Sequence, residues 1–252
     1  MVSFRELRDK YQIPRVKKIK LGWWGRYILN PPSVVIAQLL MPFRITPNQI
    51  TVVWLLMGLA GGILFSFGDY WKSIIAALIF QLTIVFDGVD GLIARYKKLS
   101  SPSGEYFESV THTLVHDIFI VVGITFGAYN QTGNILMFAL GFSMVISLLL
   151  HKFLFLEKIH LFVKNKLFSK VKKTQKKIKI HKSHLTLLKK IYDSTFFLYV
   201  GISLINFVTI AAIFKRLDIL LWFYGLTFPI IIAALLFFEI YRGYGWVSEL
   251  FK

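Results

Sequence analysis

The sequence predicts an all-α integral membrane protein: a bundle of six transmembrane helices that follows an N-terminal interfacial amphipathic helix. Of the 252 residues, 56% are hydrophobic, and the mean hydropathy is +0.61, whereas soluble domains contain roughly 45–50% apolar residues. The apolar residues gather in runs of about 20, the length that crosses a bilayer. Their even spacing favours one transmembrane domain, residues 46–252, after a surface segment, residues 1–45.

The surface segment combines aromatic and basic residues. Trp23 and Trp24 lie among lysines and arginines, a mixture typical of a helix in the membrane interface. Pro31 and Pro32 are expected to interrupt this helix. The apolar stretch at residues 34–41 is too short to cross a bilayer, so it is expected to lie flat or to re-enter.

Six apolar runs follow, each long enough to span the membrane. Thr46 and Pro47 precede the first run and suit the N-cap and the first turn of a helix. The predicted spans are 49–68, 74–95, 106–128, 132–151, 195–214 and 219–241.

The net charge of +17 is distributed unevenly between alternate loops. Residues 157–191 alone contain twelve lysines, whereas the loops on the opposite side contain very few basic residues. The positive-inside rule therefore places both termini in the cytoplasm, as expected for a multi-pass protein of the cell membrane. The lysine-rich stretch 164–190 could also bind nucleic acid. Contact with anionic headgroups is the favoured interpretation, so no nucleic-acid partner is expected.

Two carboxylates interrupt the second predicted span near its cytoplasmic end. Asp87 and Asp90 lie about 60° apart around a helix. Gly91, Ala94 and Arg95 share the same face. This face therefore combines acidic groups with small residues that leave room for a ligand.

The third predicted span carries a second polar stripe. Glu108, His112 and His116 recur every four residues and so share one helix face. Asp87 lies eight residues before Arg95, and His112 lies eight residues after Gly104, where the third span opens. An antiparallel hairpin is therefore expected to bring them to the same depth, roughly 6–12 Å from the cytoplasmic ends at about 1.5 Å per residue.

Acidic groups at that depth require compensation. A central acidic residue costs roughly 2.5–3.5 kcal/mol on insertion scales, and three facing carboxylates repel one another. A divalent metal in a water-filled, cytoplasm-facing cavity is the favoured explanation. The chain has no cysteine, which excludes thiolate ligands and thiol catalysis. The alternative is an ion pair of Arg95 with Asp87 or Asp90, but one arginine cannot balance three acids.

The residues of the two spans also follow a recognisable spacing. In chain order they are Asp87-x2-Asp90-Gly91-x2-Ala94-Arg95-x8-Gly104-x3-Glu108-x3-His112. This pattern resembles the signature of the CDP-alcohol phosphotransferases (CDP-alcohol phosphatidyltransferases), D-x2-D-G-x2-A-R-x8-G-x3-D-x3-D. The six positions before the last two match. The Thr46-Pro47-Asn48 sequence at the first span and the basic segment before it also fit this family.

The last two positions depart from the family pattern. The third and fourth aspartates of the family correspond to Glu108 and His112. Glutamate keeps a carboxylate ligand, whereas histidine supplies a base that titrates near neutral pH or a ligand suited to manganese or zinc. His112 as a bridging core histidine is the structural alternative. His116 lies outside the motif and is expected to support the site or to pack.

The resemblance implies a metal-dependent enzyme of the EC 2.7.8 type. Such an enzyme transfers a phospho-alcohol, or a similar CMP-linked group, from a CDP-alcohol to a hydroxyl of a lipid, polyol or glycan and releases CMP. Phospholipid or cell-envelope polymer synthesis is the expected pathway, and a homodimer is implied. The implied metal is magnesium or manganese, with zinc as an alternative. Its implied ligands are Asp87, Asp90, Glu108 and His112.

The resemblance also implies roles at the nucleotide. Glu108 and His112 are the implied catalytic residues, with His112 as the general base. The implied nucleotide-binding residues are Asn48, Gly91, Ala94, Arg95 and Gly104. Two alternatives remain: a relative that has lost catalysis and only binds nucleotide or lipid, and an ion-coupled transporter. A transporter predicts paired broken helices, and the sequence shows no such pair.

Overall fold

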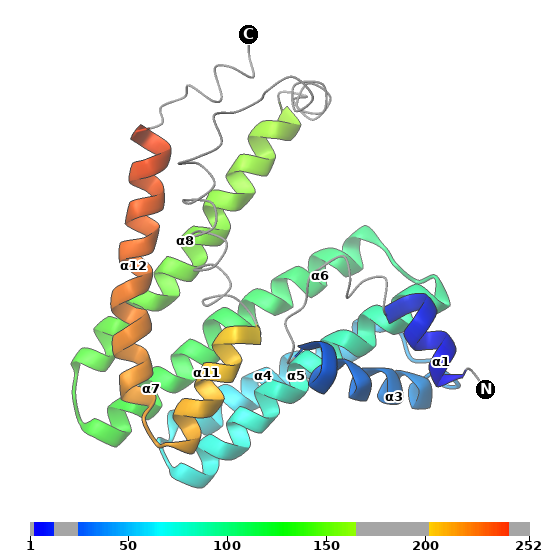
Figure 1. Cartoon of the computed structure of the whole chain (residues 1–252), viewed down its shortest axis with the longest axis horizontal. Helices are drawn as coiled ribbons and strands as arrows, with labels where there is room; N and C mark the ends of the chain where they lie inside the picture. Colours follow the sequence, from blue (N-terminus) through cyan, green and yellow to red (C-terminus); the bar gives the residue numbers. More distant parts are fainter. Residues whose placement is uncertain (1–2, 13–24, 165–201, 242–252) are drawn as a thin grey trace.

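A computed structural model of the chain describes residues 3–12, 25–164 and 202–241. All regular secondary structure in these ranges is helical. Long helices lie alongside one another, as Figure 1 shows, and the short helix α3 (Asn30–Leu40) packs against α5 (Tyr70–Lys97), with α1 (Phe4–Glu6) beside α3. The chain is thus a multi-pass helical membrane protein.

Five helical segments in the described residues are long and apolar enough to cross a membrane. They are α4 (Pro47–Ser66), α5 (Tyr70–Lys97), the continuous segment Pro102–Thr132, Leu136–Leu154 of α8 (Leu136–Lys164) and Leu217–Phe237 of α12 (Leu217–Tyr241). The predicted span 195–214 begins outside the described residues, and its described part is the 12-residue helix α11 (Ile202–Ile213). The sixth span therefore stays a prediction.

The segment before α4 differs from its prediction at the two prolines. Pro31 and Pro32 do not interrupt a helix; they lie in the first turn of α3, directly after a π-helical turn, Gly25–Leu29. The first-turn N–H groups of a helix have no intrahelical acceptor, so proline is tolerated there. Trp23 and Trp24 lie outside the described residues, so the interfacial amphipathic helix stays a prediction.

Thr46 caps the start of α4, as predicted, and Gln49 makes the cap reciprocal. The Gln49 backbone N–H donates to Thr46 Oγ1 over 3.4 Å, and the Thr46 N–H donates to the Gln49 side chain over 2.9 Å. Pro47 occupies the first turn. This cap closes the N-terminal end of the helix that contributes Asn48, Thr51 and Trp54 to the site.

Close backbone contact packs α4 against α7 (Ile120–Thr132). A Cβ atom on Gly62 would lie 2.7 Å from the Phe119 carbonyl oxygen, and one on Gly123 would lie 2.9 Å from the Gly62 Cα. Small residues permit such approach between membrane helices. The contact holds α4 firmly beside the third span and so fixes which α4 side chains face the acidic residues.

The hairpin between α5 and α6 (Pro102–Thr113) brings the two motif helices together. α5 ends at Lys97, whose Nζ donates to the carbonyl oxygens of Phe43 and Ile45 over 2.6 and 3.1 Å. Ser101 caps α6 by accepting the Gly104 N–H over 3.1 Å. These contacts tie the loop between α3 and α4 to the end of α5.

Candidate functional site

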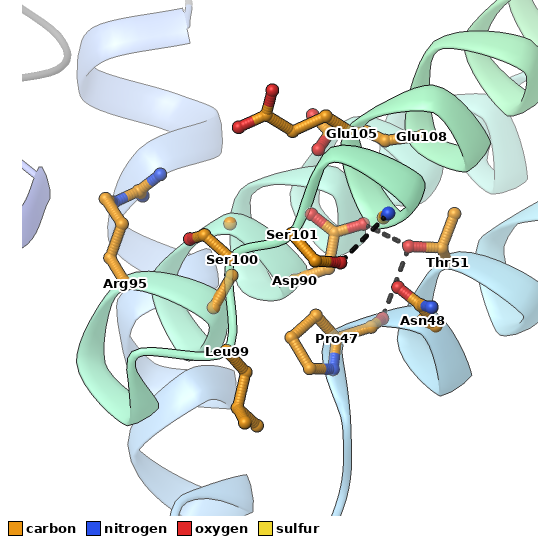
Figure 2. Close-up of a pocket in the computed structure, with 13 residues that line it drawn as sticks. Pro47, Asn48, Thr51, Asp90, Arg95, Leu99, Ser100, Ser101, Glu105 and Glu108 are labelled. Carbon is orange, nitrogen blue, oxygen red and sulfur yellow. Dashed lines mark hydrogen bonds between the residues drawn. The ribbon is translucent and has the colours of Figure 1, made fainter.

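A pocket of about 370 Å³ opens where the start of α4, the end of α5 and the start of α6 meet. Figure 2 shows Asn48 and Thr51 of α4 on one side of Asp90, and Arg95 of α5 on the other. The pocket combines carboxylate, guanidinium, amide and hydroxyl groups. The predicted site residues that line it are Asn48, Asp90, Gly91, Ala94, Arg95, Gly104 and Glu108.

The small residues of the motif lie where the helices approach one another. A Cβ atom on Gly104 would lie 3.2 Å from both Asn48 Oδ1 and Ser101 Oγ. A larger residue at this position would therefore displace two polar groups of the pocket wall. Gly91 and Ala94 line the same pocket from α5.

An acid–histidine cluster joins α5 and α6 deeper in the bundle. Asp87, Glu108 and His112 each offer one ligand atom, and the three atoms lie within 4.8 Å of one another. Asp87 Oδ1 lies 2.8 Å from His112 Nε2. The structure thus places Asp87 and His112 at the same depth. Among the described residues, this is the one group of at least three His, Asp or Glu side chains close enough to hold a metal ion.

Asp90 lies beside this cluster and is almost fully buried. Its Oδ2 accepts hydrogen bonds from Thr51 Oγ1 over 2.8 Å and from Trp54 Nε1 over 2.9 Å. Its Oδ1 is buried and has no hydrogen-bond partner among the described residues. Buried carboxylate oxygens are almost always satisfied. The free Oδ1 therefore marks the side of Asp90 on which a ligand or cation would fit.

The donor set suits a divalent cation. Three carboxylates supply the hard oxygen ligands that magnesium and manganese prefer, and the imidazole of His112 extends the choice to manganese and zinc. The orphaned Asp90 Oδ1 and the converging atoms of Asp87, Glu108 and His112 are two independent observations that fit such an ion.

A histidine pair continues the cluster away from the pocket. His112 Nδ1 lies 3.1 Å from His116 Nδ1, and His116 Nε2 lies 3.2 Å from Thr83 Oγ1. The indole ring of Trp54 stacks on His116 at 5.8 Å and 17°, and its centroid lies 5.2 Å from that of His112. Trp54 therefore contacts Asp90 and both histidines.

The segment that carries His116 is a π-helical stretch, Leu114–Phe119, between α6 and α7. π-helical turns inside α-helices occur often at functional sites. The same stretch presents Asp117, which forms an ion pair with Lys152 of α8. Lys152 Nζ also donates to Thr113 Oγ1 over 2.9 Å. This ion pair attaches α8 to the helix that carries the histidines.

The sequence did not predict the residues that support the site from around it: Thr51, Trp54, Thr83 and the Asp117–Lys152 pair. Thr51 and Trp54 are three residues apart and so share a face of the first span. A buried indole N–H usually has an acceptor. A tryptophan that shares a helix face with a threonine inside an apolar span therefore indicates a buried acceptor on the neighbouring helix.

Comparison with known proteins places these residues in a wider group. A model of the CDP-alcohol phosphatidyltransferase family matches residues 44–224, well over half of the chain. A bifunctional IPC transferase and DIPP synthase of Thermococcus kodakarensis is 27% identical over 110 residues, which are 44% of this chain and 24% of that protein. The match therefore spans about a quarter of that relative's length.

Two further relatives carry the same name. The protein of Archaeoglobus fulgidus is 28% identical over 104 residues, 41% of this chain and 20% of that protein. The protein of Aquifex aeolicus is 26% identical over 116 residues, 46% of this chain and 26% of that protein. These two matches therefore span a fifth to about a quarter of the relatives' lengths.

Proposed function

The chain belongs to the CDP-alcohol phosphatidyltransferase family, and from this premise we propose that it transfers a phospho-alcohol, or a similar CMP-linked group, from a CDP-alcohol to a hydroxyl acceptor. CMP is the leaving group. The acceptor is a lipid, polyol or glycan, and the product enters phospholipid or cell-envelope polymer synthesis.

One observation carries this proposal. Asp87, Glu108 and His112 converge within 4.8 Å, and Glu108 also lines the pocket together with Asp90 and Arg95. Transfer at phosphorus requires neutralised phosphate charge and a positioned nucleophile more than covalent help. A divalent cation held by the carboxylates would neutralise the phosphate charge together with Arg95, and the pocket would position the acceptor hydroxyl.

The donor is bound by the pocket. Asp87, Asp90, Glu108 and His112 are the residues that would hold a divalent metal, magnesium or manganese foremost and zinc as the alternative. When bound, the metal neutralises and orients the pyrophosphate. Arg95 donates to a phosphate oxygen, for which its forked donors are suited. The nucleotide lies against Gly91, Ala94 and Gly104, with Asn48 as a polar contact.

His112 is the proposed general base. The acceptor oxygen forms a bond to the phosphorus of the transferred group, and the bond between that phosphorus and the bridging oxygen of CMP breaks. The proton of the acceptor hydroxyl goes to His112 Nε2. The Nδ1 of His112 contacts His116, whereas Nε2 contacts Asp87 of the acid cluster, so Nε2 is the nitrogen placed to act as base or as metal ligand. Whether His112 acts as base or as metal ligand, Glu108 supplies the carboxylate on which that role depends.

The orientation in the membrane agrees with a soluble nucleotide donor. The pocket is formed by the ends of α4, α5 and α6 that the charge distribution assigns to the cytoplasm. We therefore propose that both termini and the pocket face the cytoplasm of a cell membrane. The homodimer that the family resemblance implies stays a prediction.

The test is CMP release by purified protein with a panel of CDP-alcohols, acceptors and divalent metals. The reactions that the relatives' names specify, IPC transfer and DIPP synthesis, are the first to assay. Asp87→Asn should abolish release. Asp69→Asn is the matched control: it makes the same change at the other end of α5, where Asp69 caps the helix and Asn caps equally well.

Two outcomes would contradict the proposal. If no CDP-alcohol is converted but CMP-containing nucleotides bind, the chain is a relative that has lost catalysis. If His112→Ala turns over as fast as the wild type, His112 is not the base. A rate that falls with Asp69→Asn as much as with Asp87→Asn would point to general damage to α5.

A further inference from the structure

The turn of α5 that carries Asp87 and Asp90, the acidic turn, is held from two sides. Gly88 and Asp90 lie two residues apart, so they point about 160° away from each other around the helix axis. Asp90 faces α4, from which two side chains donate to it. Gly88 faces α3, because Ser33 is the residue that a Cβ atom placed on this glycine would meet. The acidic turn therefore lies between α4 and α3.

The contact at Gly88 leaves no room for a side chain. A Cβ atom on Gly88 would lie 2.9 Å from both Cβ and Oγ of Ser33, closer than real Cβ contacts come. Small residues permit such approach between helices. Any other residue at position 88 would therefore displace α3 or turn α5 about its axis.

Hydrogen bonds fix the Ser33 side chain in this position. Its hydroxyl donates to the Asn30 carbonyl oxygen over 2.7 Å and accepts from Gln12 Nε2 over 3.2 Å. Gln12 Nε2 also donates to the Asn30 carbonyl oxygen over 2.8 Å. Ser33 is 1% exposed and Gln12 is 7% exposed, and a buried polar group is costly to leave unpaired. Ser33 is therefore held in the orientation that contacts Gly88.

Gln12 ends a π-helical stretch, Leu7–Gln12, that packs against both α3 and α5. The Tyr11 ring of this stretch meets the Tyr96 ring near the end of α5, with centroids 5.7 Å apart and an interplanar angle of 73°. The stretch is thus attached to α5 directly and to α3 through the Gln12 amide. It therefore supports Ser33 from outside the transmembrane bundle.

From these contacts we propose that Ser33 is a positioning residue for the acid cluster. Through Gly88 it fixes the rotation of the acidic turn about the axis of α5. That rotation determines where the carboxylates of Asp87 and Asp90 lie relative to the ligand atoms on α6. Groups at a functional site must be held within about 0.5 Å of the productive geometry, so a small rotation is enough to weaken the site. The consequence for metal binding and catalysis rests on the proposed function, whereas the position of Asp90 does not.

Gly88→Ala tests the contact from the side of α5. The added methyl group meets Ser33, and we expect Mn²⁺ affinity to fall by about 10- to 100-fold, the range for residues that orient metal ligands. Paramagnetic resonance of free Mn²⁺ measures the affinity of the full chain in lipid nanodiscs. The matched control is Gly225→Ala in α12, where the new Cβ would lie 2.8 Å from Leu140 Cβ of α8. These two helices line neither the pocket nor the acid–histidine cluster, so the control should lose stability but keep its Mn²⁺ affinity.

A double variant shows whether Ser33 is the residue that the methyl group displaces. Ser33→Gly combined with Gly88→Ala moves the side chain from α3 to α5 and relieves the clash. Because substitutions at contacting residues are coupled, we expect the double variant to bind Mn²⁺ about tenfold more tightly than Gly88→Ala. A double variant that binds as weakly as Gly88→Ala would overturn the role of Ser33.

The indole N–H of Trp54 reports the position of Asp90 without metal or substrate. The chain is labelled with ¹⁵N-tryptophan, and Trp54→Phe assigns the resonance. Because this N–H donates to Asp90, we expect its resonance to shift in Gly88→Ala and to return towards that of the wild type in the double variant. It should stay in place in Gly225→Ala. An unshifted resonance in folded Gly88→Ala, or an equal shift in Gly225→Ala, overturns the positioning role.

Ser33→Ala keeps the proposal testable if Gly88→Ala does not fold. Alanine adds no atoms but removes the hydroxyl to which Gln12 donates, so Mn²⁺ affinity should fall by about tenfold and the Trp54 resonance should shift. The control is Ser147→Ala, which removes another buried hydroxyl that donates to a carbonyl of its own helix. It should change neither property. Equal behaviour of the two variants would overturn the proposal.

Failure of the proposed function gives a different result. If the wild type converts no CDP-alcohol and binds no Mn²⁺, the proposed function fails, and the Trp54 resonance alone decides whether Ser33 positions the acidic turn. If the wild type converts a CDP-alcohol but folded Gly88→Ala keeps the wild-type Mn²⁺ affinity and Trp54 resonance, the proposed function stands and the positioning role fails.

Discussion

Trp54 donates its indole N–H to Asp90 over 2.9 Å, and so joins the first span to the acid cluster of the second. The same Asp90 oxygen accepts the Thr51 hydroxyl. Both donors come from one face of α4, which the glycine contacts with α7 hold in place. Two neutral donors engage one oxygen of Asp90, and the other oxygen has no hydrogen-bond partner among the described residues. The first span therefore determines which side of Asp90 meets a ligand.

Trp54→Phe tests the structural part of this contact. Phenylalanine keeps an aromatic ring against the histidines but removes the N–H, so Asp90 loses one of two donors. We expect the free energy of unfolding to fall by about 1–3 kcal/mol, the cost of leaving a buried polar group less satisfied. Thermal unfolding in detergent measures it. The control is Trp71→Phe, because Trp71 is 70% exposed. Equal losses for both variants would mean that the indole bond to Asp90 contributes nothing.

Thr51→Val tests whether the second donor orients Asp90 for a metal. Valine matches threonine in shape but cannot donate to Asp90. Residues that orient metal ligands typically change metal affinity by about 10- to 100-fold, and we expect a loss of that size for Mn²⁺. Paramagnetic resonance of free Mn²⁺ measures the affinity. Thr51→Ser keeps the hydroxyl and is expected to bind as the wild type does. Weak binding by the Ser variant together with normal binding by the Val variant would show that the methyl group matters instead.

Helical periodicity was sufficient to predict which motif residues meet. Asp87 and His112 lie at one depth because rise per residue and an antiparallel hairpin determine depth. The partners on α4 could not be predicted in this way. Apolar residues of α4 occupy all of its faces, so the sequence pattern does not indicate how the helix is rotated about its own axis. That rotation, and hence the contacts of Thr51 and Trp54, depends on packing against α5 and α7.

The prolines show a second limit of sequence reasoning. Proline breaks the interior of a helix but suits its first turn, and the difference depends on where the helix starts. Pro31 and Pro32 were expected to interrupt a helix, yet α3 begins at Asn30, directly before them. No capping side chain marks this start, unlike Thr46 at α4, where the cap allowed the boundary to be predicted.

Glu108→Gln tests the replacement of the family's third aspartate. Glutamine keeps the size but removes the charge from a cluster in which Glu108 meets Asp87 and His112. We expect CMP release to fall by at least about 100-fold, the order that one preorganised electrostatic group contributes. Glu105→Gln is the matched control, because Glu105 lines the same pocket one turn earlier but lies outside the cluster. Similar rates for the two variants would remove Glu108 from the proposed catalytic residues.

Lys152→Met tests the ion pair that attaches α8 to the π-helical stretch. Methionine keeps an unbranched apolar chain but leaves Asp117, which is 6% exposed, without its counter-charge. Removal of one partner of a buried pair costs about 3–5 kcal/mol. Because the Lys152 side chain is 38% exposed, we expect the lower end of that range in the free energy of unfolding. Thermal unfolding measures it, with the exposed Lys72→Met as the control.

The double variant Asp117→Asn with Lys152→Met separates the ion pair from other effects of the lysine. If the cost of Lys152→Met is the uncompensated carboxylate, a neutral amide at residue 117 should restore most of the lost stability, since the pair is then absent rather than half broken. Because Asp117 directly follows His116, the single variant is also expected to lower the rate of CMP release, and the double variant to recover part of it. A double variant as unstable as Lys152→Met alone would show that Lys152 acts through Thr113 or the helix packing and not through Asp117.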